Sequence, residues 1–343
     1  MGELALYRKY RPQAFADVVG QDHIIEVLEK SLKSGAIAHA YLFFGSRGTG
    51  KTSIARIVAR ELGCAPEDIY EIDAASNRGI DDVRELREGV RSLPFRSPYK
   101  AYIIDEVHML SKDAFNAFLK TLEEPPKHVV FMLATTEIEK VPETVVSRCQ
   151  TFTFKKPSRV ILKKVVEEIA RKEGRAIEPG AADLIALLGD GSFRDTQGVL
   201  QLVLSGTTGT VTREGAEKIT AAPSSALVED FIAALAEGKL ESVLGVIRTA
   251  TEQNLNFKLF LKLILEAMRT ILLFRFSPKM KDELRGEFSS DEIQFFERYA
   301  GSAGASINSQ TLVEILDAYT AIGRAHIPEL PLELAVIKLL KKA

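Results

Sequence analysis

The stretch GSRGTGKT, from Gly45 to Thr52, combines the residue types of a loop that binds phosphate groups. Its glycines let backbone N–H groups turn toward a phosphate, and a helix beginning at Lys51 would point its positive dipole end at the same place. The Lys51 ammonium would reach the β- and γ-phosphate oxygens, and the Thr52 hydroxyl would ligate Mg²⁺. An ordinary glycine turn is the alternative, but the loop stands between the apolar run AYLFF and the helical segment SIARIVARELG, as a nucleotide loop must. The predicted nucleotide-binding residues of the loop are Gly45, Ser46, Arg47, Gly48, Thr49, Gly50, Lys51, Thr52 and Ser53.

Two adjacent carboxylates end the apolar run AYIIDEV, residues 101–107. Asp105 is predicted to hold Mg²⁺ through water, and Glu106 to polarise a water molecule for attack on a γ-phosphate. Neighbouring carboxylates repel each other, and a bound cation would offset that repulsion. A solvated loop is the alternative interpretation. His108 is a candidate catalytic base, but a packing or hydrogen-bonding role is the better interpretation.

Two more side chains are candidates for contact with a γ-phosphate. Thr136, or with less support Thr135, ends the run VVFMLATT and would hydrogen-bond the attacking water or the phosphate where strand ends gather. Arg148 lies in the polar turn SRC, where it either pairs with a surface acid or, in an oligomeric ATPase, reaches the γ-phosphate of a neighbour as an arginine finger. We interpret the adjacent Cys149 as a small buried residue and not as a nucleophile.

Arg194 lies in the first turn of a helix that Ser192 is predicted to cap, with Asp195 three positions after the cap. A cation in that turn is disfavoured by roughly 0.3–1 kcal/mol, because the helix dipole is positive there. A phosphate facing the turn would remove the conflict, so Arg194 is a candidate sensor of the γ-phosphate. An incidental surface arginine is the alternative.

The elements that would position these residues alternate between short apolar runs and helical segments, from about residue 37 to 154. Several runs are apolar nearly throughout, as strands buried on both faces of a parallel sheet are. The alternation predicts an α/β domain over residues 1–157, followed by a small helical domain over 158–221 and a second helical domain over 222–343. The predicted strands are 40–45, 69–73, 101–107, 129–136 and 151–154.

Composition places the chain among ordinary globular proteins, with 46% apolar and 27% charged residues. Its 45 basic and 47 acidic residues give a net charge of −2, so any binding of nucleic acid requires a local basic patch. Two cysteines cannot form a disulfide framework, and the N-terminus carries no apolar signal core, so we expect a cytoplasmic protein. The apolar stretch 255–276 has charged residues along one face, which predicts a core helix and no membrane contact.

Taken together, the motifs resemble those of the AAA+ ATPases and, more narrowly, the gamma/tau subunits of the bacterial DNA polymerase III clamp loader. The resemblance covers residues 1 to about 205 and is carried by YRKYRPQAFADVVGQDHI, HAYLFFGSRGTGKTSIARIVAREL, EIDAASNRGIDDVREL, YIIDEVHMLSKDAFNAFLKTLEEPP, LATTEIEKVPETVVSRCQTF and GSFRDTQGVLQ. It implies an α/β AAA+ P-loop domain with a parallel five-stranded sheet, a helical lid and an all-helical collar. The collar would hold several subunits in a ring.

The resemblance also implies roles for individual residues. Thr136 would be sensor 1, Arg194 sensor 2, and Arg148 would complete the ATP site of the adjacent subunit. The adenine pocket would be lined by Arg11, Pro12, Val18 and Val19. Contacts with the DNA backbone would be made by Ser76, Arg78 and Lys120, for each of which a solvated surface position is the alternative.

The implied function is that of an ATPase that uses ATP and Mg²⁺ to open a sliding clamp and load it onto primer–template DNA. The implied partners are the delta and delta-prime subunits and further gamma/tau copies in a hetero-pentamer. Two departures from the family are expected: we predict a chain without the tau-specific tail, and because the segment ELGCAPEDIYEID keeps Cys64 alone of a four-cysteine zinc module, we predict no zinc site.

Three other functions are disfavoured by the sequence. A small-molecule kinase would not explain the SRC turn or the helical domains, and a non-hydrolysing loader subunit is expected to have lost Lys51 or the two acids. A branch-migration motor is the closest alternative, since it shares the AAA+ core. It should add a winged-helix domain with strands near the C-terminus, and no such strands are predicted here.

Overall fold

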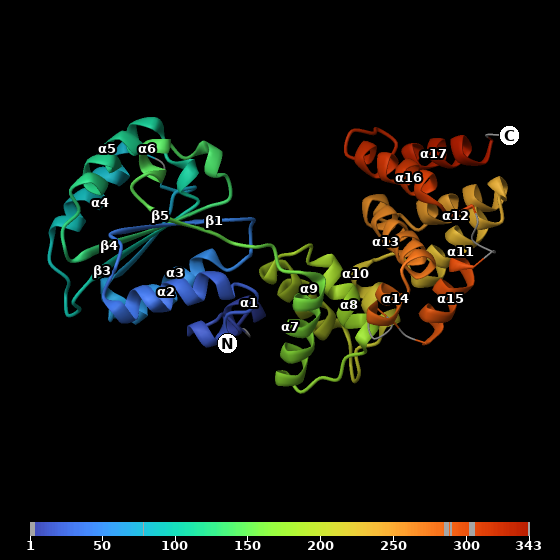
Figure 1. Cartoon of the computed structure of the whole chain (residues 1–343), viewed down its shortest axis with the longest axis horizontal. Helices are drawn as coiled ribbons and strands as arrows, with labels where there is room; N and C mark the ends of the chain where they lie inside the picture. Colours follow the sequence, from blue (N-terminus) through green and yellow to red (C-terminus); the bar gives the residue numbers. More distant parts are fainter. Residues whose placement is uncertain (1–3, 78, 285–287, 289, 302–305, 342–343) are drawn as a thin grey trace. The chain divides into compact units, whose positions relative to one another are not determined.

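The structure, a computed structural model, describes residues 4–77, 79–284, 288, 290–301 and 306–341 (Figure 1). By contacts the chain separates into two compact units. The first is formed by Met1–Ile169 with Ala186–Gln201, and the second by Ala170–Ile185 with Leu202–Ala343. The predicted division into three domains stays a prediction, and the two units are described separately.

The first unit is built on a five-stranded sheet with the strand order β2-β3-β4-β1-β5, and every pairing in it is parallel. This confirms the predicted parallel sheet and the position of each predicted strand. Strand β4 is buried along its whole length, whereas the edge strand β2 is largely accessible. The strands are β1 (Ala40–Phe44), β2 (Ile69–Asp73), β3 (Lys100–Asp105), β4 (Val129–Thr135) and β5 (Gln150–Thr153).

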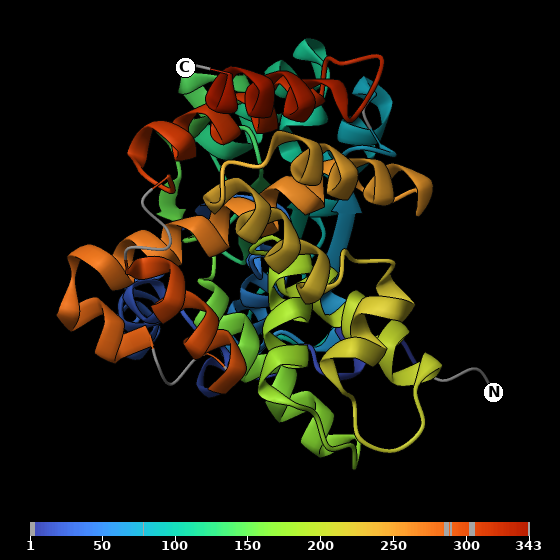
Figure 2. The same cartoon turned by 90° about the vertical axis from the view of Figure 1, so that its right-hand side faces the viewer.

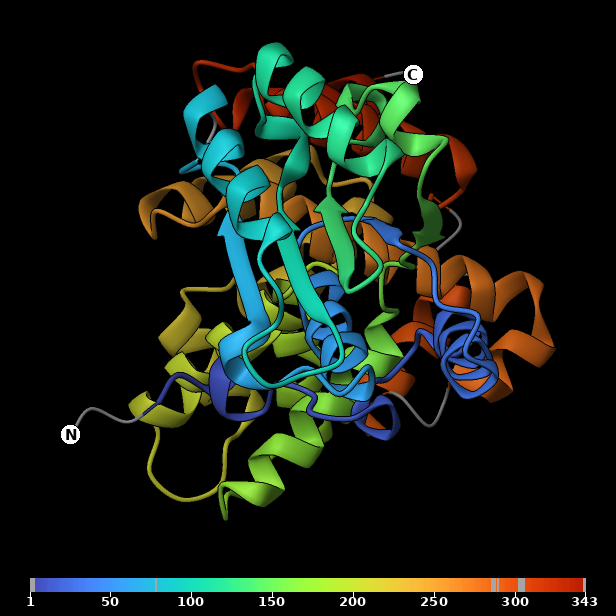
Figure 3. The ribbon, with the colours of Figure 1, turned by 90° about the vertical axis from the view of Figure 1, so that its left-hand side faces the viewer.

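Helices cover both faces of this sheet (Figures 1 and 3). One face packs against α4 (Ile80–Arg91), α5 (Lys112–Glu123) and α6 (Glu143–Val146). The other face packs against α2 (Asp22–Ser34) and α3 (Lys51–Glu61). Successive strand residues point to opposite faces and both faces are covered, which is why the strands are apolar nearly throughout.

Short elements complete the first unit. They are α1 (Leu6–Lys9), η1 (Phe15–Asp17), η2 (Pro66–Asp68), η3 (Val107–Met109) and η4 (Ile138–Lys140). Two longer helices, α7 (Arg159–Lys172) and α9 (Phe193–Gly206), begin in the first unit and end in the second.

The second unit is helical, apart from one isolated parallel bridge between Ile177 and Val211 in its described residues (Figure 2). Its long helix α13 (Phe257–Phe276) is buried along one face and has its charged residues on the accessible side, which confirms the predicted core helix. Helix α8 (Pro179–Leu188) begins in the second unit and ends in the first. The remaining helices are α10 (Arg213–Thr220), α11 (Ser225–Ala236), α12 (Leu240–Glu252), α14 (Pro278–Leu284), α15 (Ser290–Ala300), α16 (Ser309–Ile322) and α17 (Leu330–Leu340).

No single helix within the described ranges has the length and apolar character to cross a membrane. One bent pair, Arg213–Thr220 with Ser225–Ala236, meets both criteria by length and composition alone.

Candidate nucleotide-binding site

The predicted phosphate loop connects the end of β1 to the start of α3. In a parallel sheet the carboxyl ends of all strands meet at one edge, so the loop shares that edge with the residues that follow β3 and β4. The register places Phe44, the last residue of β1, beside Thr135 at the end of β4. The sheet therefore gathers the loop, the two acids and the two threonines predicted from the sequence.

Two glycines give the loop its shape. Gly48 has φ +74° and Gly50 has φ +102°, backbone conformations that residues with a Cβ rarely adopt. Gly50 is also the N-cap of α3, and because it has no side chain it leaves the first N–H groups of that helix to an anion.

Lys51 lies inside the loop with only 6% of its surface exposed. Its Nζ donates to the carbonyl oxygens of Gly45, at 2.8 Å, and Ser46, at 3.0 Å. Burial lowers the pKa of the Lys51 ammonium, while the nearby Glu106 and Asp105 carboxylates act in the opposite direction. An anion beside this ammonium would offset the cost of burying it, so the loop fits a phosphate group.

Thr52 and Asp105 form the second contact of the site. The Thr52 hydroxyl donates to Asp105 Oδ2 at 2.9 Å, which joins the start of α3 to the end of β3. Hydroxyl and carboxylate oxygens are the ligands that Mg²⁺ prefers, and this ion usually takes few protein ligands and completes its shell with water and phosphate oxygens. The pair therefore fits Mg²⁺ bound to a nucleotide. In the described part of the chain no group of three or more His, Cys, Asp or Glu side chains could hold a metal ion by itself.

Glu106 lies directly after β3 with φ +49°, a left-handed conformation that is uncommon for a residue with a side chain. Its Oε2 accepts a hydrogen bond from Thr136 Oγ1 at 3.1 Å. Thr135 is instead fully buried, and its hydroxyl lies 3.0 Å from His108 Nδ1. The structure thus brings Thr136 to the acid, and it confirms a hydrogen-bonding position for His108.

The segment that carries Arg194 packs on the phosphate loop within the first unit. The Phe193 N–H donates to the Gly48 carbonyl at 2.9 Å, and Ser192 Oγ accepts from the N–H of Asp195 at 3.2 Å, which confirms Ser192 as the helix cap. The Arg194 guanidinium lies 5.9 Å from the centre of the Tyr7 ring. The Arg194 charge is close enough to Lys51 to contribute to the lowered pKa of that ammonium, and an anion such as a phosphate would offset the repulsion between the two cations.

Substituting Gly48 tests this packing. An alanine Cβ there would lie 2.0 Å from Ser192 Oγ, so Gly48→Ala must displace the start of α9 as well as strain the backbone. Gly35→Ala is the matched control, because Gly35 has φ +72° and nothing within 4 Å of the added carbon. We expect Gly48→Ala to lower the free energy of unfolding by about 1–3 kcal/mol more than Gly35→Ala does, because of overpacking. The thermal midpoint of Gly48→Ala should therefore be the lower of the two. Equal midpoints for the two variants would contradict the contact.

The predicted adenine-pocket residues flank η1. Val18 packs against the core between the sheet and α2 and α3, whereas Val19 is 43% exposed. Arg11 accepts a hydrogen bond at its carbonyl from the Gln13 side chain, and Pro12 is half-buried. Arg60 of α3 donates to Gln13 Oε1 at 2.6 Å, which attaches this segment to the helix that follows the phosphate loop. An adenine-binding role for these residues stays a prediction.

Arg148 lies outside this cluster. Its guanidinium donates to Glu123 Oε1 at 2.8 Å and to the Thr144 carbonyl at 2.7 Å. The adjacent Cys149 is half-buried, and burial raises the pKa of its thiol to about 12. A thiol that stays protonated is a poor nucleophile, in line with the sequence interpretation.

The residues predicted to contact DNA belong to other segments of the chain than the phosphate loop. Ser76 is exposed and donates to Asp73 Oδ2 at 3.0 Å, and Lys120 is exposed on α5. Arg78 lies outside the described residues.

Known proteins share this sequence over most of its length. The tau subunit of DNA polymerase III from Bacillus subtilis is 35% identical over 364 residues, which covers 99% of this chain and 63% of that protein. The gamma subunit from Buchnera aphidicola is 37% identical over 301 residues, which covers 80% of this chain and 80% of that protein. This chain belongs to the DNA polymerase III gamma/tau subunit family. A family model described as DNA polymerase III, delta subunit, also matches residues 20–79 and 67–158.

The fold of this gamma/tau family member is that of an AAA+ ATPase. The RuvB Holliday junction branch migration motor of Thermotoga maritima superposes with a TM-score of 0.54, covering 85% of this chain and 91% of RuvB at 20% identity. Identity that low establishes a shared fold and no shared function. The chain spans 63% of the length of the Bacillus tau subunit.

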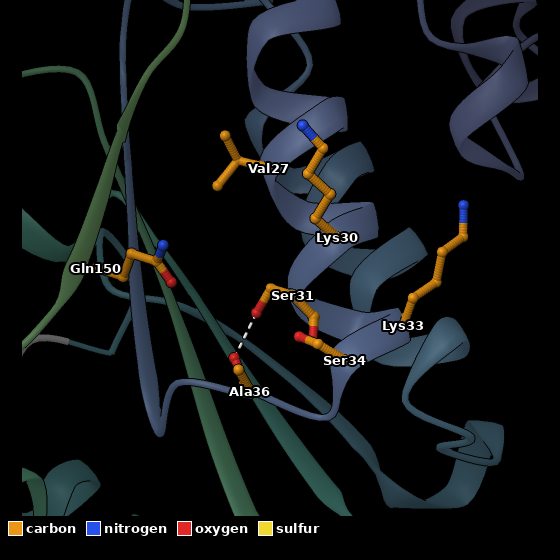
Figure 4. Close-up of a pocket in the computed structure, with 7 residues that line it drawn as sticks. All are labelled: Val27, Lys30, Ser31, Lys33, Ser34, Ala36 and Gln150. Atoms are coloured by element: carbon orange, nitrogen blue, oxygen red, sulfur yellow. Dashed lines mark hydrogen bonds between the residues drawn. The ribbon is translucent and has the colours of Figure 1, made fainter.

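A hollow of this gamma/tau chain lies at the end of the sheet opposite to the phosphate loop (Figure 4). It is lined by Val27, Lys30, Ser31, Lys33, Ser34, Ala36 and Gln150. Ala36 precedes β1 and Gln150 begins β5, so the hollow is at the amino ends of the strands, while the phosphate loop is at their carboxyl ends. The Lys33 ammonium pairs with Glu29 at 2.9 Å. The hollow is therefore separate from the nucleotide site.

Two residues near the site were missed in the sequence. Tyr7 lies under Arg194, and Glu137 lies 3.3 Å from His108 Nε2. Glu137 directly follows the predicted Thr136, so its place at a strand end was a usable signal. No local pattern marks Tyr7, because it is far from Arg194 along the chain.

Proposed function

We propose that the chain is an ATP-dependent subunit of a clamp loader, which binds and hydrolyses ATP to open a sliding clamp and load it onto primer–template DNA. The observation that carries the proposal is that the carboxyl ends of β1, β3 and β4 bring together the buried Lys51 of the loop, the hydrogen-bonded pair Thr52–Asp105 and the hydrogen-bonded pair Thr136–Glu106. Membership of the gamma/tau family supports the choice of DNA replication as the process.

Each residue of the site has one task in the proposed reaction. Lys51 and the N–H groups at the start of α3 bind the β- and γ-phosphates. Thr52 and Asp105 hold Mg²⁺, which when bound neutralises charge that develops on the phosphate oxygens. Glu106 accepts a proton from the attacking water, and Thr136 holds the Glu106 carboxylate in place.

Replacing Lys51 tests the phosphate contact. Lys51→Ala removes a charge-assisted hydrogen bond worth about 1.5–3 kcal/mol, so we expect the affinity for MgATP to fall about 10- to 150-fold. Titration calorimetry on the purified chain measures this loss. Lys33→Ala is the control, because Lys33 is an exposed lysine paired with Glu29. Unchanged affinity in Lys51→Ala would argue against the assignment of the loop.

We propose that the site works between subunits. Arg148 is exposed enough to reach a neighbour, with 35% of its side chain accessible, and acts as the finger for the ATP of the adjacent subunit. Arg194 senses the γ-phosphate of its own subunit, and Arg11, Pro12, Val18 and Val19 receive the adenine. The helices of residues 222–343 join this chain to the delta and delta-prime subunits and to further gamma/tau copies in a pentameric ring.

DNA is bound through its backbone in this proposal. The exposed Ser76 and Lys120 contact phosphates, which carry no base sequence, so binding is independent of sequence and weakens as salt rises. Arg78 belongs to the same proposal, although it lies outside the described residues.

The ATPase rate tests the function as a whole. We expect slow hydrolysis by the isolated chain and a marked increase when it is assembled with its partner subunits, a sliding clamp and primed duplex DNA. A full rate in the isolated chain, indifferent to clamp and DNA, would contradict the proposal.

A branch-migration motor shares the fold and is the alternative function. It would need a winged-helix domain with strands, but after Thr153 the described residues contain one isolated bridge and no strand.

A further inference from the structure

The imidazole of His108 lies between two carboxylates from different parts of the first unit. Its Nδ1 is 3.5 Å from Glu106 Oε2, and its Nε2 is 3.3 Å from Glu137 Oε1. Only 6% of the His108 side chain is exposed, so its neighbours fix the orientation of the ring. A buried polar ring with a carboxylate at each nitrogen does more than fill space, because an apolar side chain would serve for that alone.

The Glu137 end of this bridge is anchored to the sheet and to η4. The Glu137 N–H donates to Thr135 Oγ1 at 3.1 Å, and Lys140 Nζ lies 2.6 Å from Glu137 Oε2. The hydrogen bond from Lys140 lowers the pKa of the Glu137 carboxyl, which keeps it ionised. Thr135 Oγ1 is also 3.0 Å from His108 Nδ1, so the ring is tied to the last residue of β4 as well.

At Glu106 the two neighbouring side chains approach only one of the two carboxylate oxygens. Thr136 Oγ1 and His108 Nδ1 both approach the same Glu106 atom, Oε2. The second oxygen, Oε1, can then serve as the proton acceptor for a water molecule. A flexible glutamate whose Oε2 accepts a hydrogen bond from Thr136 and lies 3.5 Å from the His108 ring has fewer orientations to lose when the reaction begins.

We propose that His108 is a positioning residue, which connects Glu106 to Glu137 and Thr135 and so holds the Glu106 carboxylate where it polarises the attacking water. This inference rests on the proposed function, since it assigns His108 a place in the same reaction. His108 itself touches neither nucleotide nor water in this role, and it acts through Glu106.

Two substitutions separate positioning from packing. His108→Asn keeps a polar atom close to the place of Nδ1, whereas His108→Leu keeps the bulk and removes both polar atoms. We expect His108→Leu to lower kcat of the assembled complex about 10- to 100-fold, the cost of a misplaced reacting group, and His108→Asn to recover most of the rate. The KM for ATP and the affinity for MgATP should stay unchanged in both, because the phosphate contacts are untouched.

A double-mutant cycle with Glu106→Gln completes the test. A residue that acts only through Glu106 has no further effect once that carboxylate is gone, so His108→Leu should not slow the Glu106→Gln complex further. The inference is overturned if His108→Leu is as active as His108→Asn, or if its effect persists in the Glu106→Gln background. If Glu106→Gln alone leaves the rate unchanged, the proposed function itself fails at Glu106, and the inference fails with it.

Discussion

A complex that carries Glu106→Gln should bind ATP normally and hydrolyse it about 10²–10⁴ times more slowly, the usual contribution of a positioned general base. Glutamine has the shape of glutamate and still accepts the hydrogen bond that Thr136 donates at 3.1 Å, so the site keeps its geometry. It has no anionic oxygen to take a proton from water. The loss should therefore appear in kcat and not in the affinity for ATP, as single-turnover hydrolysis and calorimetry would show.

Glu139→Gln is the matched control for this experiment. Glu139 is an exposed glutamate on η4, and its substitution makes the same change of charge close to the site without touching Glu106. We expect wild-type hydrolysis in this variant. If both variants lose the same activity, the loss reflects net charge near the site and not the chemistry of Glu106.

The sheet and the phosphate site were predictable because their signals are local. A strand buried on both faces must be apolar along its length, and β4 shows this most clearly, being buried at every position. The glycines, Lys51 and Thr52 are adjacent in sequence, and Asp105 and Glu106 end a strand whose carboxyl edge the loop shares. The 2.9 Å contact between Thr52 and Asp105 follows from that shared edge.

Contacts between distant segments could not be predicted in the same way. Gly48 and Ser192 meet because the start of α9 packs on the phosphate loop, which depends on how the helices after β5 return to the first unit. The boundary between the two units could not be predicted either, because it also depends on contacts between segments that are distant in the sequence. Helix α8 has one continuous apolar pattern, yet Ile185 belongs to the second unit and Ala186 to the first.

Arg148→Ala should leave ATP binding intact and slow hydrolysis in the assembled complex by about 10³–10⁵, the range known for arginine fingers. The isolated chain should lose little stability, because the Arg148–Glu123 pair is accessible to solvent and such pairs contribute about 0–1 kcal/mol. Glu123→Gln provides the control. It removes the negative charge of Glu123 but keeps Arg148, so hydrolysis near the wild-type rate in this variant would exclude a merely structural role for the ion pair.

Mixing two inactive variants shows whether Arg148 acts in its own subunit or in the next. An Arg148→Ala chain keeps its nucleotide pocket and lacks a finger, whereas a Lys51→Ala chain keeps its finger and lacks a working pocket. In a ring assembled from both, an intact pocket will sometimes face an intact finger. Hydrolysis should therefore reappear in the mixture, although each variant alone is slow. If the mixture stays as slow as its components, Arg148 serves the ATP of its own subunit or none, because a finger acting within one chain cannot be supplied by another.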